Sequence, residues 1–194
     1  MKKLIAELTK YGKLDKKEIR LLEQNVRLLH FPKDALVIGK GKIDDSTYLL
    51  REGIWRAYVD RDGEELTLWF AVPGESILSP WGYIKGAPSR YSLVASSDST
   101  ALEIKKGTLQ ELVRTAPFLW QWLYDTALEA LLNTDNMLVD ISDPKAEKRY
   151  HAFMKKAPEI FRNIPLKEVA GFIGVTPQSL SRIRGKIKSE GTEK

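Results

Sequence analysis

The chain lacks cysteine altogether and has only two histidines, His30 and His151, which lie far apart in its 194 residues. Without cysteine there can be no disulfides, thiolate zinc sites, cysteine-ligated iron–sulfur clusters or cysteine nucleophiles. With only two distant histidines, we expect neither a multi-histidine metal centre nor a Ser-His-Asp triad. These absences remove much of the range of enzymes, so we expect neither a metal cofactor nor a catalytic site.

Long hydrophobic runs are missing as well. No uninterrupted apolar stretch approaches the roughly 18–20 residues of a membrane span. The N-terminus, "MKKLIAELTKYGKLDKKE", starts with basic residues, but Glu7 and Lys10 interrupt the apolar region that a signal peptide would need. Hydrophobic residues make up 43% and charged residues 29%, as in a soluble globular protein with a core. We therefore expect a cytoplasmic protein without a membrane partner.

The positive charge is confined to one part of the chain. The net charge is +5, yet residues 144–194 hold 12 Lys and Arg against 5 Asp and Glu, whereas residues 1–143 hold 19 against 21. A segregated basic segment favours a polyanionic partner. A solvated basic tail remains the alternative.

The first segment, from residue 1 to about 28, has the apolar periodicity of a helix. The residues that recur at this spacing, among lysines and glutamates, are Leu14, Ile19, Leu22, Val26 and Leu29.

The pattern changes between residues 30 and about 106, where short β-rich runs alternate with turn residues. The clearest turn is Asp62-Gly63, because a two-residue hairpin needs positive φ angles that Asp and Gly tolerate. At least six or seven strands at this spacing predict an antiparallel barrel or sandwich. Trp55 and Trp69 fall on expected strands and are predicted to lie in its core.

From Gly107 to Ile141 the pattern becomes helical, with an apolar seam of about three heptads. The seam consists of Trp120, Tyr124, Ala127, Leu131, Thr134, Leu138 and Ile141, with further leucines beside it at 119, 123, 128 and 132. Such a helix needs apolar cover on more than one side. The β segment could cover one side and the same helix of a second chain the other. A helix buried wholly within its own chain is the alternative.

A domain boundary is expected at "SDPKAE", where Asp143 suits an N-cap and Pro144 the first position of a new helix. Beyond it, "IPLKEVAGFIGVTPQSLSRIRGKI" predicts two short helices joined by three or four residues, a helix-turn-helix. Gly174 lies in the turn, where a positive φ favours glycine. Thr176 and Pro177 suit the N-cap and first position of the second helix.

The second of these helices has an apolar face and a polar face. At about 100° per residue, Leu180, Ile183 and Ile187 lie together, and the opposite side is polar and basic. Gln suits adenine and Arg suits guanine in the major groove, while Lys and Arg suit phosphates. The predicted DNA-binding residues are Thr176, Gln178, Ser179, Ser181, Arg182, Arg184, Lys186 and Lys188. An ordinary helical hairpin with a solvated basic face is the alternative.

Along nearly its whole length, the chain resembles the Crp/Fnr family of bacterial transcription regulators. The resemblance is carried by the β pattern "FPKDALVIGKGKIDDSTYLLREGIWRAYVDRDGEELTLWFAVPGE", the long helix after it and the helix-turn-helix. The ending "RYHAFMKKAPEIFRNIPLKEVAGFIGVTPQSLSRIR" is similar to the branch common in Bacteroidetes-type bacteria. In this family Gln178 and Arg182 would occupy two base-reading positions, and Pro177 would occupy a third without a side-chain donor.

The resemblance implies an α+β fold. Its parts would be an antiparallel β-roll, jelly-roll-like and of the cyclic nucleotide-binding type, with flanking helices, then a long central dimerisation helix and a C-terminal helix-turn-helix domain. Only "SEGTEK" follows Lys188. This is too short for the paired strands of the family's wing, so the wing should be reduced or absent.

The chain departs from the family at the cyclic-nucleotide cassette. Members that bind cyclic nucleotides have a Gly-Glu pair after a Pro-Gly-Glu-type turn and an Arg-Ser or Arg-Thr pair further on. Here those positions read Leu78-Ser79 and Ser89-Arg90. We therefore expect the fold without cyclic AMP binding, and an unidentified small effector in its place.

The irregular stretch "GESILSPWGYIKGAPSRYS" is the candidate effector site. Its polar groups could hold a small, anionic ligand against an apolar wall. The candidate pocket residues are Glu75, Ser79, Trp81, Ser89 and Arg90. The alternative is aromatic packing that docks the roll onto the central helix, with no ligand.

The combined expectation is a homodimeric regulator with three parts: an effector domain over residues 1–107, a dimerisation helix over 108–142 and a DNA-binding domain over 143–194. Its dimer interface would contain Trp120, Tyr124, Ala127, Leu131 and Leu138. Its partners would be double-stranded DNA, a second copy and RNA polymerase. One rival is an effector-binding module that acts through protein partners without specific DNA binding. A β-barrel enzyme of the cupin type is a second rival, but the chain lacks the clustered His and carboxylate ligands it needs.

Overall fold

The computed structural model describes residues 2–189 and begins with two short helices, α1 (Lys2–Leu8) and α2 (Lys16–Asn25). A capping box starts α2: the Asp15 carboxylate accepts the Glu18 N–H, and the Glu18 carboxylate accepts the Asp15 N–H. The predicted helix to residue 28 is too long. Val26 already has extended backbone and starts a strand, because residues 26–31 pair with residues 99–104 and so satisfy their backbone groups across a sheet.

The β-roll consists of two four-stranded antiparallel sheets, with orders β1-β8-β3-β6 and β2-β7-β4-β5. The strands are β1 (Val26–Phe31), β2 (Leu36–Ile38), β3 (Ser46–Glu52), β4 (Trp55–Arg61), β5 (Glu64–Ala71), β6 (Ser76–Leu78), β7 (Ser92–Ala95) and β8 (Ser99–Lys105), and helix α3 (Pro80–Lys85) lies between β6 and β7. The antiparallel fold predicted from the strand pattern is confirmed.

The β4–β5 hairpin has the predicted turn. Asp62 and Gly63 have φ angles of 56° and 84°, the combination that a primed two-residue turn requires. The roll encloses its own apolar core, in which Trp55 is fully buried and donates its indole N–H to the Ser99 hydroxyl over 2.8 Å. Trp69 is only half-buried and packs at the edge of this core.

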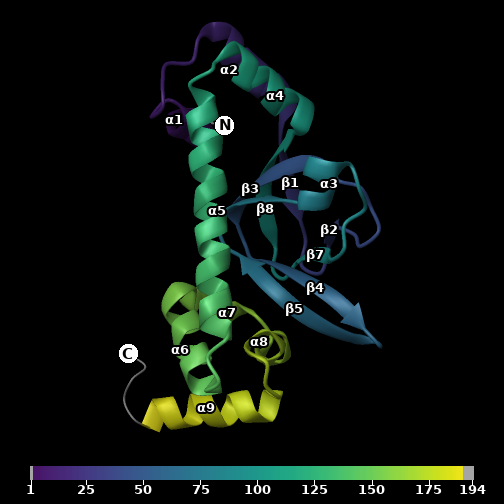
Figure 1. Ribbon diagram of the computed structural model, residues 1–194, viewed down its shortest axis with the longest axis vertical. Helices are drawn as coiled ribbons and strands as arrows, with labels where there is room; N and C mark the ends of the chain where they lie inside the picture. The colour runs from purple at the N-terminus through teal and green to yellow at the C-terminus, as the bar shows by residue number, and fades with distance from the viewer. Residues whose placement is uncertain (1, 190–194) are drawn as a thin grey trace.

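The expected continuous central helix is two helices, α4 (Lys106–Thr115) and α5 (Leu119–Ile141). The break coincides with Pro117, since proline lacks the N–H that an uninterrupted helix needs and disfavours helical backbone at the preceding residue. The start of α5 packs with α1, α2 and α4 in a second apolar core. From there α5 runs past the roll to the opposite end of the molecule (Figure 1).

Four helices follow: α6 (Ala146–Lys156), α7 (Pro158–Asn163), α8 (Leu166–Ile173) and α9 (Pro177–Ser189). The predicted start of α6 at Pro144 is wrong by two residues, because the Asp143 carboxylate accepts the Lys145 N–H over 2.8 Å in the preceding turn. The part of the chain described after Ile141 is helical and contains no strand of a wing; residues 190–194 lie outside it. None of the described helices is long and apolar enough to cross a membrane.

Candidate nucleic-acid interface

Helices α8 and α9 form the predicted helix-turn-helix. Gly174, directly after α8, has a φ of 75°, and the Val175 N–H returns to the Ala170 carbonyl over 3.0 Å. This left-handed glycine reverses the chain at a position where a side chain would be strained. Ala170 is fully buried, as a close crossing of the two helices requires. The predicted turn is therefore confirmed in its residues and in its geometry.

The start and the inner face of α9 also follow the prediction. Thr176 caps the helix: its hydroxyl accepts the Ser179 N–H over 3.2 Å. Leu180 and Ile187 are fully buried in the core of the C-terminal helices, and Ile183 packs against them. The apolar face fixes which side of α9 is turned outward.

The predicted base-reading residues lie on this outer side. Gln178, Ser181 and Arg182 are exposed, as is Thr176, while Ser179 and Arg184 are half-buried. Lys186 is exposed and bonded to both carboxylate oxygens of Glu147 on α6, at 3.2 Å each. The side chain of Lys188 lies outside the described part of the chain. The helix thus presents hydrogen-bond donors and cations on one surface.

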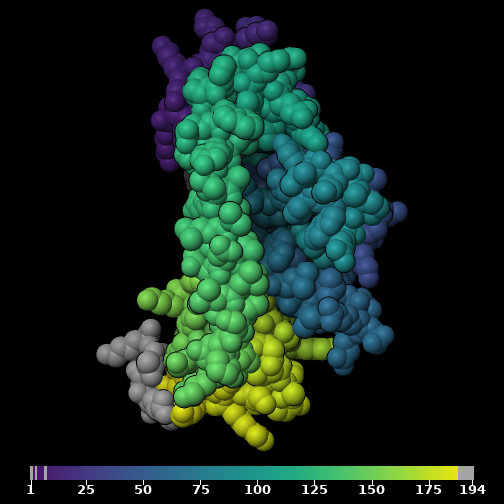
Figure 2. All heavy atoms as spheres, viewed as in Figure 1, coloured from purple at the N-terminus to yellow at the C-terminus, as the bar shows by residue number. Residues whose placement is uncertain are grey.

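This surface is at an end of the molecule. Helix α9 crosses the lower end of α5, away from α1 and α2 (Figure 1), and the atoms of the roll lie above it (Figure 2). A long rod such as a DNA duplex could therefore approach it without meeting the β-roll.

The predicted dimer residues on α5 form an uncovered apolar face. Trp120 is 64% exposed, Leu131 58% and Leu138 52%. Tyr124 and Ala127 are exposed as well, together with Leu128, Leu132 and Val139 beside the seam. The alternative of a helix buried within its own chain is wrong, because only the other side of α5, with Trp122, packs inside the chain. A contiguous apolar face of this kind marks an interaction surface.

Three of the five candidate effector residues, Trp81, Ser89 and Arg90, lie beside Tyr91. Its ring meets Trp81 edge-on, with 5.5 Å between ring centroids, and Arg90 stacks over Trp81 at 5.9 Å. Ser79 and Ser89 are buried but occupied: Ser79 caps α3, and Ser89 donates to the Tyr91 carbonyl over 2.8 Å. Burial raises the pKa of Tyr91 to about 12, so its hydroxyl stays protonated.

Glu75 does not join this group. It lies in the turn between β5 and β6, where its carboxylate accepts the Val72 N–H over 3.0 Å. Burial raises the pKa of Glu75, against the opposing effect of that hydrogen bond. The aromatic packing at Trp81 lies against the core of the roll. Tyr83 of the same stretch packs against the core that contains the start of α5, as the ligand-free alternative supposed. The stretch is thus filled with internal contacts.

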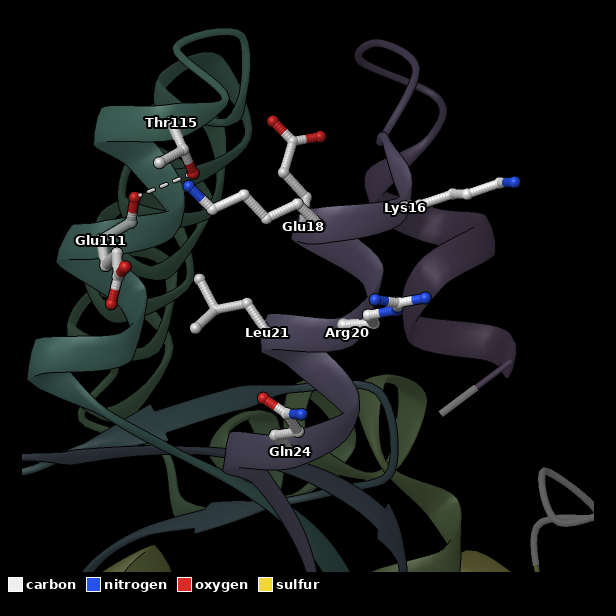
Figure 3. A pocket seen from close by; sticks show the side chains of 8 residues that line it. Lys16, Glu18, Arg20, Leu21, Gln24, Glu111 and Thr115 are labelled. Carbon is white, nitrogen blue, oxygen red and sulfur yellow. Dashed lines mark hydrogen bonds between the residues drawn. The ribbon is translucent and has the colours of Figure 1, made fainter.

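An open groove of about 450 Å³ between α2 and α4 was not anticipated from the sequence. In Figure 3, Lys16 and Arg20 point away from Glu111 and Thr115, so the cations do not converge on one point. Glu18 is engaged in the capping box. Within residues 2–189, no three metal-binding side chains lie together as a candidate metal site.

Known proteins share this arrangement. The family model "Cyclic nucleotide-binding domain" matches residues 28–116. The nitrogen fixation regulation protein FixK of Bradyrhizobium diazoefficiens is 24% identical over 193 residues, covering 92% of this chain and 78% of its own. FixK2 from Bradyrhizobium japonicum has a TM-score of 0.73 at 17% identity, covering 86% of each chain.

A third comparison covers most of the chain. A structure described as a transcriptional regulator of the Crp/Fnr family from Eubacterium rectale has a TM-score of 0.70 at 16% identity, covering 92% of this chain and 85% of its own. At these identities the structures establish the fold, and the family match and the sequence relative agree with it. The β-roll, the long helix and the terminal helix-turn-helix make this chain similar to Crp/Fnr-type transcription regulators along most of its length.

Proposed function

We propose that this protein is a homodimer that binds a palindromic DNA site, with α9 of each copy in a major groove. One observation carries the proposal: a capped, well-packed α9 turns Gln178, Ser181 and Arg182 outward at a free end of the molecule. Gln and Arg can read adenine and guanine edges there. Arg184, Lys186 and Lys188 would contact phosphates and set the register.

The exposed face of α5 supports the dimer. If two copies pair through Trp120, Tyr124, Ala127, Leu131 and Leu138, the two-fold axis runs beside the helices and both α9 helices lie at the same end. Two-fold symmetry then requires a palindromic site with half-sites about one helical turn apart. RNA polymerase as a further partner and a cytoplasmic location belong to the same proposal.

Cyclic AMP is not expected to be the effector. Leu78 and Ser79 stand where cyclic-nucleotide members have Gly and Glu, and Ser79 is buried as the cap of α3. Arg90 is exposed and stacked on Trp81. Any effector would therefore use other contacts in the roll, starting from Trp81 and Arg90.

Selection of random duplex DNA by the purified protein tests the proposal. We expect enrichment of a palindrome with half-sites about one turn apart, and binding that weakens with salt. The selection should be repeated at two salt concentrations, with sequencing of the bound fraction. If no duplex is enriched and binding does not depend on salt, the proposal fails. The protein would then act as an effector-binding module through protein partners.

A further inference from the structure

The helix-turn-helix is joined to the roll by a buried arginine. Arg56 on β4 has a side chain only 7% exposed, and its guanidinium contacts Glu65 on the neighbouring strand at 2.5 Å. Its Nε lies 2.9 Å from the carboxylate of Glu168, which belongs to α8. This second contact is an ion pair and does not have hydrogen-bond geometry. One cation therefore spans two parts of the fold.

The carboxylate of Glu168 makes two contacts where α8 meets the roll, a junction that we call the joint. Its side chain is 23% exposed, and a carboxylate oxygen lies 3.5 Å from the Ser96 hydroxyl at the end of β7. Removing one partner of a buried ion pair leaves the other charge without compensation, which is costly. Loss of the Glu168 charge should therefore loosen the contact between α8 and the roll.

Apolar packing continues across the same boundary. The Phe70 ring on β5 stacks on Phe153 of α6 with 5.8 Å between centroids, and meets Phe172 of α8 edge-on at 5.6 Å. Ile54, beside β4, is buried in the core of the C-terminal helices. The C-terminal helices thus do not have a core of their own that is separate from the roll. The ion pair and the apolar contacts thus dock the C-terminal helices on the roll in one arrangement.

In that arrangement α9 faces away from the roll at the end of the molecule (Figures 1 and 2). Its Gln178, Ser181 and Arg182 are already exposed. If two copies pair along α5, both recognition helices already face the same side. The docked arrangement thus meets the geometric needs of DNA binding.

We propose that Arg56 and Glu168 are positioning residues that hold the helix-turn-helix in its DNA-competent arrangement. The inference rests on the proposed function and deepens it, since it names what fixes the recognition helix. Neither residue touches DNA. When the joint opens, only a fraction of the molecules can bind, and the apparent affinity falls by that fraction.

The first test compares two variants that each remove one carboxylate from Arg56. Glu168→Gln breaks the contact across the joint, and Glu65→Gln breaks a contact within the roll. We expect Glu168→Gln to weaken binding to the selected duplex by about fivefold or more, the usual scale of coupling between sites. Affinities for all sequences should fall by the same factor with an unchanged salt slope, because α9 keeps its contacts. Glu65→Gln should stay within about twofold of wild type, well below the usual coupling between sites.

A cross-link tests the direction of the effect. The chain has no cysteine, so Ser96→Cys with Glu168→Cys places the only two thiols at the joint. Before treatment, this double variant should bind DNA weakly, as Glu168→Gln does. A short bifunctional thiol reagent should restore the wild-type affinity. Thermal melting before and after treatment shows whether each form is folded.

The outcomes separate the inference from the proposed function. If wild type binds its selected duplex and Glu168→Gln binds equally well, the inference is wrong and the proposed function stands. If the cross-linked protein loses binding, the docked arrangement is the inactive one and the inference is reversed. If neither the wild type nor the cross-linked form binds any duplex, the proposed function fails and the inference falls with it.

Discussion

The guanidinium of Arg149 on α6 donates to the backbone carbonyl of Ile173, the last residue of α8, over 2.8 Å. Its Nη1 donates to the Asp143 carbonyl over 2.6 Å. The last carbonyls of a helix have no partner within the helix, and a cation placed there satisfies them and complements the helix dipole. Arg149 thus ties the entrance of the C-terminal domain to the turn of the helix-turn-helix.

Arg149→Met should destabilise the protein by about 2–3 kcal/mol, because it removes charge-assisted hydrogen bonds to two backbone carbonyls. Urea unfolding followed by circular dichroism measures the change. The control is Lys148→Met, next to it in the sequence, whose exposed side chain lies 3.7 Å from Asp143. That substitution should cost less than about 0.5 kcal/mol. Equal midpoints for the two variants would contradict the role given to Arg149.

Two glycines of the helix-turn-helix should respond to alanine with opposite signs. Gly174 has a φ of 75°, so Gly174→Ala should cost about 1–2 kcal/mol. Gly185 lies within α9 with open space where a Cβ would be, so Gly185→Ala should stabilise the protein by about 0.5–1 kcal/mol. Thermal unfolding of the two variants side by side checks this. A shift in the same direction for both would count against the observed turn.

Arg182→Ala should relax sequence choice at one position of each half-site, by about 1–3 kcal/mol of discrimination. The measurement is binding to the selected palindrome and to its single-base variants. Arg162→Ala, at an exposed position of α7, removes the same charge away from the outer face of α9 and should leave sequence choice unchanged. If Arg182→Ala weakens all sequences equally, Arg182 contacts phosphate and does not read a base.

Lys188→Ala should weaken binding to all DNA sequences alike and reduce the slope of log affinity against log salt by about one unit. The reason is that a phosphate contact releases counterions but carries no sequence information. Titrations of the selected duplex and a scrambled duplex at several salt concentrations measure both effects. A change in the ratio of the two affinities would argue against a pure phosphate contact.

Leu131→Glu should convert the dimer to monomer, because it places a charge in the centre of the apolar face of α5. Asn133→Glu is the matched control, since Asn133 is exposed on the same helix but does not belong to the apolar seam. Sedimentation equilibrium of both variants gives the association state. The monomer should also lose its preference for a palindrome. A dimer that survives Leu131→Glu would place the interface elsewhere.

The buried Glu103 should make the fold sensitive to acid. Burial alone would raise its pKa, but hydrogen bonds from Ser46 at 2.8 Å, from Lys105 and from Arg27 outweigh it and hold the pKa below the ordinary 4.5. The carboxylate therefore contributes stability that is present above pH 4.5 and is lost as the pH falls through the lowered pKa.

Glu103→Gln should reduce the fall in unfolding free energy at low pH, which is the acid limb of the stability curve. Unfolding free energies measured between neutral pH and acid would show the change. Glu23→Gln, at an exposed position of α2, serves as the control and should leave the acid limb as in wild type. An unchanged limb in Glu103→Gln would mean that other carboxylates dominate the acid response.

Local patterns predicted the parts of the molecule whose shape depends on near neighbours. The Asp62-Gly63 hairpin follows from backbone angles that few residues tolerate. The helix-turn-helix follows from a glycine in the turn, a capping threonine and apolar residues at helical spacing. The exposed seam of α5 follows in the same way from its heptad pattern. In each case the deciding interactions lie within about one or two turns of chain.

Local sequence patterns gave wrong predictions where pairing with residues far away in the sequence determines the secondary structure. Val26 and Leu29 fit a helix by spacing, but pairing with Ile104 and Ala101 draws them into a sheet. The break at Pro117 could have been predicted, because proline is the signal, but the apolar pattern on both sides of it hid the break.

By itself the sequence determined the order of parts, the last helix with its polar outward face, and the family resemblance, because these depend on spacing, caps and charge along the chain. Only the tertiary structure decided that the effector-site serines are already used in internal hydrogen bonds. It alone placed Arg56 against Glu168, which lie 112 positions apart in the numbering of the chain. No periodicity encodes such a contact, because an ion pair between two parts of a fold exists only once both are folded and packed together.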